Sequence, residues 1–198
     1  MKETNEASKV EVVNEVQVKI KKKSFLSEII SFLIPIAIAI VIALVLKQFV
    51  FANAVVPTGS MLDTIQIKDR IIASRLAYNN NDPERYDIVL FYYPDDESQI
   101  YVKRVIGLPG ETVQIVNGVV YVTKPDGEIT QLNDDFVTTE VPTGDYGPYT
   151  VPENSYFMLG DNRNHSADSR FWENQFVSKD KIIGKVLFRY FPSFSTLK

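Results

Sequence analysis

The chain has 198 residues, a formal net charge of −4 at pH 7, one histidine and no cysteine. A sequence without cysteine has no disulfide, thiol nucleophile or thiolate metal site, and a single histidine excludes a multi-histidine zinc site. The acidic balance argues against a nucleic-acid partner, which would need a basic footprint. Hydrolytic chemistry would therefore depend on Ser, Thr, Lys, Asp, Glu or Tyr side chains, with at most one histidine.

Residues 1–24 are polar, carry charges of both signs and contain no aromatic residue. Such a composition cannot bury enough apolar surface to offset the entropy of ordering, so it predicts a disordered cytoplasmic tail. The tail ends in a basic cluster that consists of Lys19, Lys21, Lys22 and Lys23.

The next segment, residues 25–51, is predicted to be a transmembrane anchor. Ile29 to Leu46 is apolar except for Ser31, and as a helix it would span about 27 Å of a ~30 Å hydrocarbon core. The lysine cluster precedes this span and only Lys47 follows it closely. The positive-inside rule then places the tail in the cytoplasm and residues 52–198 on the extracytoplasmic face of the cell membrane.

Two alternatives remain for the apolar segment. It could be a core helix of a soluble protein, or a cleavable signal peptide with Ala52-Asn53-Ala54 as its A-x-A site. The apolar run is longer than the usual ~7–15 residues of a signal peptide, which favours an uncleaved anchor.

Residues 52–198 are predicted to form an extracytoplasmic catalytic domain of all-β structure. Strands are expected over 71–73, 87–92, 101–106 and 182–190, which are rich in β-branched and aromatic residues. Residues 113–116 and 119–122 flank Asn117-Gly118, which predicts a type I′ hairpin. We expect an exposed loop over 138–152 and no long amphipathic helix after residue 60. The pattern indicates coiled antiparallel sheets or a barrel, preceded by one transmembrane helix.

Three segments carry candidate chemistry, and the first is Pro57-Thr58-Gly59-Ser60-Met61. A tight turn here would expose the Ser60 hydroxyl and leave backbone N–H groups free for an oxyanion hole. The same pentapeptide also fits an ordinary turn serine.

The second segment contains Lys103, which on a strand shares a face with Tyr101 and Val105. Burial among apolar side chains would disfavour the charge of this lysine and lower its pKa. The neutral amine could then take a proton from a serine. The alternative is a lysine on a solvated strand face.

The third segment, Gly160 to Arg170, concentrates small polar and charged residues between apolar flanks. Asp161, Asp168 and Arg170 could pair in a buried network, and Ser166 could orient a lysine amine. His165 raises the alternative of a Ser–His–Asp triad, and a solvated loop is a further alternative.

Taken together and in this order, the segments resemble the bacterial type I signal peptidase family. That family has an N-terminal anchor followed by the patterns S-x-S-M, D-I-V-x-F, K-R-x-x-G-L-P-G-[DE] and G-D-N-R-x-x-S-x-D-S-R. The corresponding segments here are Thr58–Met61, Asp87–Phe91, Lys103–Glu111 and Gly160–Arg170. The resemblance covers most of residues 25–192.

The resemblance implies that Ser60 is the nucleophile and Lys103 the general base. It assigns the oxyanion hole to the Ser60 N–H and the Thr58 side chain, and a hydrogen bond to Lys103 to Ser166. The residues that would support the site are Asp161, Arg104, Asp168 and Arg170. The walls for small substrate side chains would be Val56, Ile65, Leu90, Tyr101 and Val102.

The implied substrates are signal peptides of exported preproteins with small residues at −1 and −3, and the implied chemistry needs no metal or organic cofactor. Membrane lipid and the secretion translocon are the further partners that the resemblance implies.

The sequence departs from the family pattern at four places. Thr58 replaces a common serine, Asp63 a usual proline, Tyr86 a common glycine, and Asn164-His165 a frequent Asp-Asn pair.

Two other functions fit part of the pattern. A self-cleaving Ser/Lys regulator has similar catalytic residues, but such proteins normally carry a DNA-binding domain where this chain has its apolar span. An inactive, membrane-tethered peptide-binding homologue would keep the fold without the chemistry, and the presence of Ser60, Lys103 and Ser166 argues against it.

Overall fold

The computed structural model describes residues 25–62, 64–138 and 140–197. The predicted tail, residues 1–24, and the departure at Asp63 lie outside the described residues. The chain divides after Val45 into two compact units.

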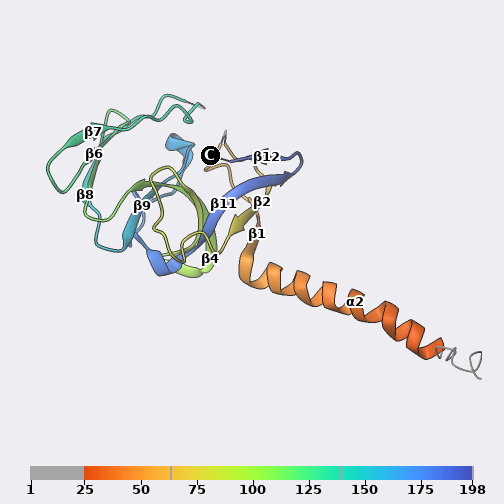
Figure 1. The fold of residues 1–198 in the computed structure, drawn as a ribbon. Coiled ribbons are helices and arrows are strands. Elements are labelled where there is room, and N and C mark those ends of the chain that lie inside the picture. The colour runs from red at the N-terminus through yellow and green to blue at the C-terminus, as the bar shows by residue number, and fades with distance from the viewer. Residues whose placement is uncertain (1–24, 63, 139, 198) are drawn as a thin grey trace, which may run out of the picture. The chain divides into compact units, whose positions relative to one another are not determined.

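The first unit contains helix α2, which runs unbroken from Phe25 to Val45 (Figure 1). One turn of π-helix, η1 (Leu46–Val50), follows it in the chain. The apolar stretch Glu28–Val50 has 23 residues and a mean hydropathy of 3.2. At 1.5 Å per residue it is about 34 Å long, enough to cross a ~30 Å hydrocarbon core. The sequence prediction of one long apolar helix is confirmed.

The second unit is built from antiparallel strands that form two sheets. The strands are β1 (Phe51–Val55), β2 (Arg70–Ser74), β3 (Ile88–Tyr93), β4 (Asp96–Gly107), β5 (Thr112–Val116), β6 (Val119–Thr123), β7 (Ile129–Gln131), β8 (Tyr146–Thr150), β9 (Ser155–Leu159), β10 (Val177–Ser178), β11 (Ile182–Phe191) and β12 (Ser195–Thr196). The helical turns in this unit after η1 are η2 (Arg163–His165) and η3 (Lys179–Lys181), within the part of the chain that the structure describes. The all-β prediction is therefore confirmed.

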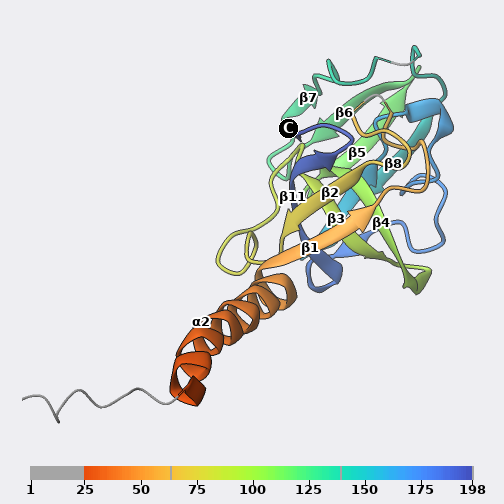
Figure 2. The same cartoon turned by 90° about the vertical axis from the view of Figure 1, so that its right-hand side faces the viewer.

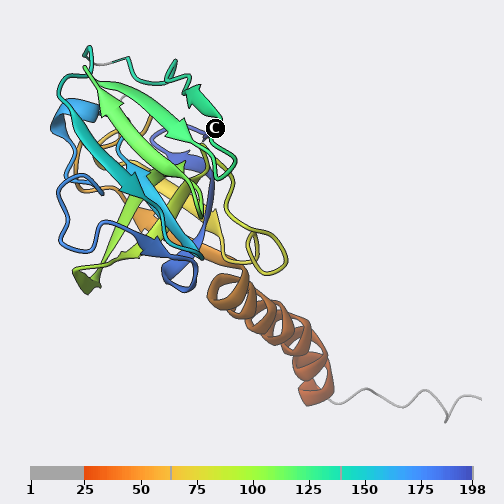
Figure 3. The ribbon, with the colours of Figure 1, turned by 90° about the vertical axis from the view of Figure 1, so that its left-hand side faces the viewer.

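The larger sheet has the order β1-β2-β11-β3-β4-β9-β10, and β12 pairs with β11 (Figure 2). The smaller sheet has the order β7-β6-β5-β8, and its strands lie side by side in Figure 3. β4 links the two sheets, because it pairs with β3 and β9 and leads directly into β5. The site described below forms around β4 and the connection after β1.

The strands predicted at 71–73, 87–92, 101–106 and 182–190 appear as β2, β3, β4 and β11. The predicted hairpin is also present, and Asn117 and Gly118 both have positive φ, as a type I′ turn requires. The prediction of an exposed loop over 138–152 is wrong in part, because Tyr146–Thr150 forms β8 and pairs with β5.

The interior contains apolar clusters on both faces of β3 in the larger sheet, and a further cluster that joins β5 and β6 of the smaller sheet to β9. In β3, Ile88 and Leu90 belong to one cluster, and Val89 and Phe91 belong to another. β3 is thus buried on both faces, which explains its continuous apolar run. Lys103 of β4 lies directly opposite Val89, so the fold carries this lysine into the interior.

Candidate active site

Ser60 lies in the connection between β1 and β2. The Val56 N–H donates to the Asp69 carbonyl at 3.0 Å, and the Lys68 N–H donates to the Val56 carbonyl at 2.7 Å, so the two ends of this connection are joined. Met61 is completely buried in the core next to the sheet. Because the Met61 side chain is packed in the core, the position of the Ser60 turn is fixed.

The Ser60 hydroxyl meets the Lys103 amine, although 43 residues separate them in the sequence. Lys103 Nζ lies 2.6 Å from Ser60 Oγ, which is hydrogen-bond distance. Ser60 is 7% exposed and Lys103 is 4% exposed. The geometry therefore places a buried amine within proton-transfer reach of a serine hydroxyl.

Burial also changes the acidity of this amine. Loss of hydration lowers the pKa of Lys103 from 10.5 to about 8, while the charges of Asp168 and Asp161 oppose the shift. A substantial fraction of the amine is then neutral near pH 8 and able to accept a proton. This is the property that a lysine general base needs.

Tyr101 lies beside the amine on the same face of β4, as the alternation of the strand predicts. Lys103 Nζ is 5.5 Å from the centre of the Tyr101 ring. That ring stacks on Tyr93 at 4.5 Å and meets the edge of Trp172. The aromatic group holds Tyr101 in place and excludes water from one side of Lys103.

Thr58 and Ser166 are the other two hydroxyl residues of the predicted site, and only Thr58 lies as predicted beside Ser60 Oγ. Thr58 Oγ1 lies 3.5 Å from Ser60 Oγ, next to the reacting hydroxyl. Ser166 is buried, but its Oγ has no hydrogen-bond partner among the described residues, so the predicted bond from Ser166 to Lys103 is absent. Ser166 Oγ packs against Gly160 instead, where a Cβ would lie only 2.2 Å from it.

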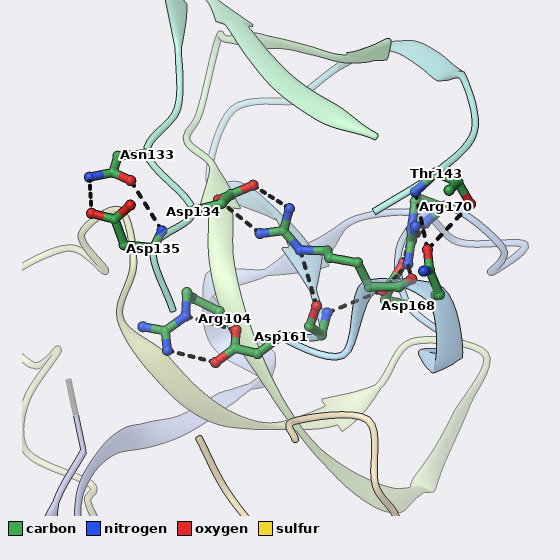
Figure 4. A network of polar contacts seen from close by, with 11 residues as sticks. Arg104, Asn133, Asp134, Asp135, Thr143, Asp161, Asp168 and Arg170 are labelled. Carbon is green, nitrogen blue, oxygen red and sulfur yellow. Dashed lines mark hydrogen bonds and ion pairs between the residues drawn. The ribbon is translucent and has the colours of Figure 1, made fainter. Parts of the chain in front are cut away.

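The charged residues predicted to support the site form two buried ion pairs, shown in Figure 4. Arg104 donates from Nε and Nη2 to the two oxygens of Asp161, at 2.9 and 2.7 Å. Arg170 donates from Nε and Nη2 to the two oxygens of Asp168, at 2.7 and 2.8 Å. Thr64 adds a hydrogen bond to Asp161 at 2.6 Å. Each carboxylate is therefore held by a two-pronged contact, a strong geometry in a dry interior.

Sequence reasoning missed two residues of this network, Arg163 and Asp134. The Arg163 guanidinium donates to both carboxylate oxygens of Asp134 and donates from Nε to the Gly160 carbonyl. Arg163 falls inside the Gly160–Arg170 segment, and its position there was a usable signal. Asp134 lies in a stretch without a motif, so nothing in the sequence pointed to it.

His165 occupies an exposed position, with its side chain 65% accessible and Nε2 3.5 Å from Glu140. The Ser60 hydroxyl is bonded to Lys103. His165 lines the same cavity as Ser60. Because its Nε2 faces Glu140 and the Ser60 hydroxyl is hydrogen-bonded to Lys103, the geometry supports a Ser/Lys pair rather than a Ser–His–Asp triad.

A cavity of about 710 Å³ opens at the Ser60–Lys103 pair. Of the predicted wall residues, the structure brings four to this cavity, namely Val56, Leu90, Tyr101 and Val102. Ile65 does not line it, because this side chain is fully buried in the core cluster that contains Val56 and Leu90. Further lining residues that the sequence did not indicate include Asn53, Ile71, Gln99 and Asn162. Among the residues described, no group of three or more His, Asp or Glu side chains could hold a metal ion.

Tyr86 has a φ of 73°, which explains why this place in the pattern is commonly glycine. The Tyr86 carbonyl accepts a hydrogen bond from Arg104 Nη1 at 2.8 Å, and the Tyr86 ring packs edge-on against Phe136. Phe136 in turn lies 4.0 Å from the Arg104 guanidinium. The departure thus adds an aromatic cover to the buried Arg104–Asp161 pair.

Comparison with known proteins identifies the family of this chain. A family model described as signal peptidase, peptidase S26, matches residues 29–191. A probable signal peptidase I-2 of Synechocystis is 37% identical over 159 residues, covering 78% of this chain and 69% of that protein. The signal peptidase I S of Bacillus subtilis is 37% identical over 180 residues, covering 87% of this chain and 92% of that protein.

A crystal structure of a signal peptidase I from Enterococcus faecalis is 34% identical and covers 53% of this chain and 97% of its own, with a TM-score of 0.44. The family match, over residues 29–191, includes the cavity, the Ser60 turn, the Lys103 strand and the buried ion pairs. The chain therefore belongs to the signal peptidase family, peptidase S26.

Proposed function

We propose that this protein is a membrane-anchored signal peptidase I, a serine endopeptidase in which Ser60 is the nucleophile and Lys103 the general base. The observation that carries the proposal is the buried contact of 2.6 Å between Lys103 Nζ and Ser60 Oγ. The lowered pKa of Lys103 supports it, because a charged amine could not accept the serine proton. Relatives named signal peptidase I support the substrate class, signal peptides of exported preproteins.

The substrate is proposed to bind as an extended strand. β1 is at the edge of the larger sheet, and the cavity is lined by residues 53–60 and 99–103 from the two sides. A peptide between them would make main-chain hydrogen bonds, and its alternate side chains at −1 and −3 would point to the same side. The apolar residues Val56, Leu90, Tyr101 and Val102 would form shallow pockets that exclude bulky side chains by steric overlap.

The proposed steps of peptide cleavage follow from the Ser60–Lys103 pair. Neutral Lys103 takes the proton of Ser60 Oγ while that oxygen attacks the −1 carbonyl carbon, and the Ser60 N–H and Thr58 hydroxyl stabilise the oxyanion. Lys103 then gives the proton to the leaving amine, which releases the mature protein and leaves an acyl-enzyme. The same amine activates the water that hydrolyses the ester. In this mechanism Asp161, Arg104, Asp168 and Arg170 fix the surrounding backbone, and Ser166 fills the space beside Gly160.

The orientation of the anchor is part of the proposal. The lysine cluster at residues 19–23 would keep the N-terminus in the cytoplasm, and residues 52–198 would face the extracytoplasmic side of the cell membrane. Membrane lipid around the anchor and the secretion translocon are the proposed neighbours. Attachment to the membrane raises the effective concentration of the enzyme near emerging signal peptides.

The test is cleavage by the purified full chain of a separate preprotein that carries an A-x-A site. We expect cleavage after the −1 residue, insensitivity to EDTA, and complete loss of activity in Ser60→Ala and Lys103→Ala. The exposed Lys124→Ala is the matched control and should retain full activity. Full activity of Lys103→Ala would refute the Ser/Lys pair, and cleavage confined to the protein's own chain would instead indicate a self-cleaving regulator.

A further inference from the structure

Asn162 holds the nucleophile turn at two consecutive carbonyl groups. Its main-chain N–H donates to the Ser60 carbonyl at 3.1 Å, and its side-chain Nδ2 donates to the Gly59 carbonyl at 3.0 Å. Gly160 supports the same contact, because a Cβ at that position would lie 2.4 Å from the Ser60 carbonyl oxygen. The backbone of residues 59–60 therefore lies directly against residues 160–162.

The bond to Gly59 also determines where the Ser60 N–H points. The Gly59 carbonyl and the Ser60 N–H belong to one trans peptide, so they point in opposite directions. The Gly59 carbonyl accepts from Leu62 N–H at 3.2 Å and from Asn162 Nδ2, which fixes it on the inner side of the turn. Within the described parts of the chain, no backbone carbonyl accepts a hydrogen bond from the Ser60 N–H. This N–H is thus directed away from Asn162 and left free.

The presence of a buried asparagine at position 162 is not explained by a gain in stability. Asn162 is 6% exposed, and its Oδ1 has no hydrogen-bond partner among the described residues. A buried acceptor without a partner destabilises the fold, because it has lost its hydration and gained no hydrogen bond. The opposite orientation of the amide would place two acceptors against each other at Gly59, so Nδ2 must be the atom that faces the carbonyl. The contact that remains for the amide is the one that holds the nucleophile turn.

We propose that Asn162 is a positioning residue that aligns the Gly59–Ser60 peptide so that the Ser60 N–H serves as an oxyanion donor. The inference deepens the proposed function and depends on it. Asn162 acts through Ser60, and the effect appears in the transition state, where negative charge develops on the substrate oxygen.

The experiment compares Asn162→Leu with wild type in the full-length protein. Leucine has the same branching at Cγ and no donor, and the Gly59 carbonyl keeps its hydrogen bond from the Leu62 N–H, so we expect little change in thermal unfolding. We expect kcat to fall by about 10- to 100-fold, less than the roughly 100- to 1,000-fold loss caused by removing an oxyanion donor outright, and KM to change by less than about twofold. The matched control is Asn164→Leu, which removes the same group from an exposed residue bonded to Glu140 and Val141, and it should leave kcat unchanged.

A second measurement separates positioning from a structural effect. A peptide aldehyde adds to Ser60 through a new Oγ–C bond, with the serine proton passing by way of Lys103 to the former carbonyl oxygen. Its affinity should fall by the same factor as kcat, whereas the affinity of the cleaved signal peptide should not change. Unchanged kcat in Asn162→Leu, or an equal loss of affinity for both peptides, would overturn the inference. Failure of wild type to cleave the preprotein would instead refute the proposed function.

Discussion

The ammonium group of an ordinary lysine is strongly hydrated, and Lys103 loses this hydration because β4 carries it into the interior opposite Val89. Among the described residues no carboxylate pairs with its amine, which is hydrogen-bonded to the neutral Ser60 hydroxyl. Burial of Lys103 is unfavourable for the charged amine, and the resulting fall in its pKa is what the proposed general base needs.

The cost of burying Lys103 predicts that Lys103→Met is more stable than wild type at neutral pH. The folded pKa is about 8 and the unfolded pKa is 10.5, a difference equivalent to about 3 kcal/mol. Below pH 8 both states hold the proton and the full cost is present. Between pH 8 and 10.5 only the unfolded state binds it, so the stability of wild type rises with pH. Urea unfolding at pH 7 and pH 10 should show the advantage of the variant shrinking. A difference that does not depend on pH would contradict the lowered pKa.

At this scale the sequence was informative where a residue belonged to a motif. The resemblance singled out Ser60 and Lys103, and the structure brings them together across 43 residues. The resemblance predicted Ile65 in the cavity wall and a hydrogen bond from Ser166 to Lys103, and neither is found in the structure. Both depend on packing between distant segments, which the sequence does not show. Asn162 lay in the recognised motif, but its contact with Gly59 appears only in three dimensions.

At the scale of elements, the segment after β9 and strand β4 are joined by the buried Arg104–Asp161 pair. Both side chains are almost fully buried, and Arg104 also contacts Tyr86 and Phe136. Removal of one partner from such a pair leaves the other charge buried and uncompensated, which typically costs 3–5 kcal/mol.

Arg104→Met should therefore lower the free energy of unfolding by about 3–5 kcal/mol, as measured by urea denaturation. The control is Lys124→Met, which breaks the exposed Lys124–Glu128 pair and should cost less than about 1 kcal/mol. Equal effects of the two substitutions would show that the buried pair does not join these elements.

Strands with a strong β-rich pattern could be predicted from the sequence, as β2, β3, β4, β5, β6 and β11 show. β8 could not, because its glycine and proline residues are typical of a loop. Pro148 is tolerated there because β8 is at the end of the smaller sheet, where a missing N–H breaks no ladder on the open side. The sequence prediction ended the anchor at Phe51, which is the first residue of β1, because the pairing of Phe51–Val55 with β2 is a tertiary contact.

At the scale of the whole molecule, the chain combines one apolar helix long enough to cross a membrane with a β-structured unit that contains the candidate site. Composition and charge distribution predicted this division. The proposed orientation gives it a function, because it would place the cavity on the side where signal peptides emerge.

The orientation can be tested by cysteine labelling, which the cysteine-free sequence makes specific. Asn80 is exposed in the β-structured unit, so the thiol of Asn80→Cys should react with a membrane-impermeant maleimide in intact cells. Ser8→Cys in the N-terminal tail should react only after lysis. The reverse pattern would show that the lysine cluster does not lie in the cytoplasm.

The pH dependence of kcat/KM tests the proposed base most directly. With a substrate that has no titrating group, kcat/KM should rise about tenfold per pH unit and level off above an apparent pKa of about 8, that of Lys103 in the free enzyme. The same profile should persist in His165→Ala, because that side chain lies at the surface with Glu140. A profile that stays flat from pH 6 to 9, or a limb near pH 6.5 that disappears in His165→Ala, would contradict a buried lysine as the base.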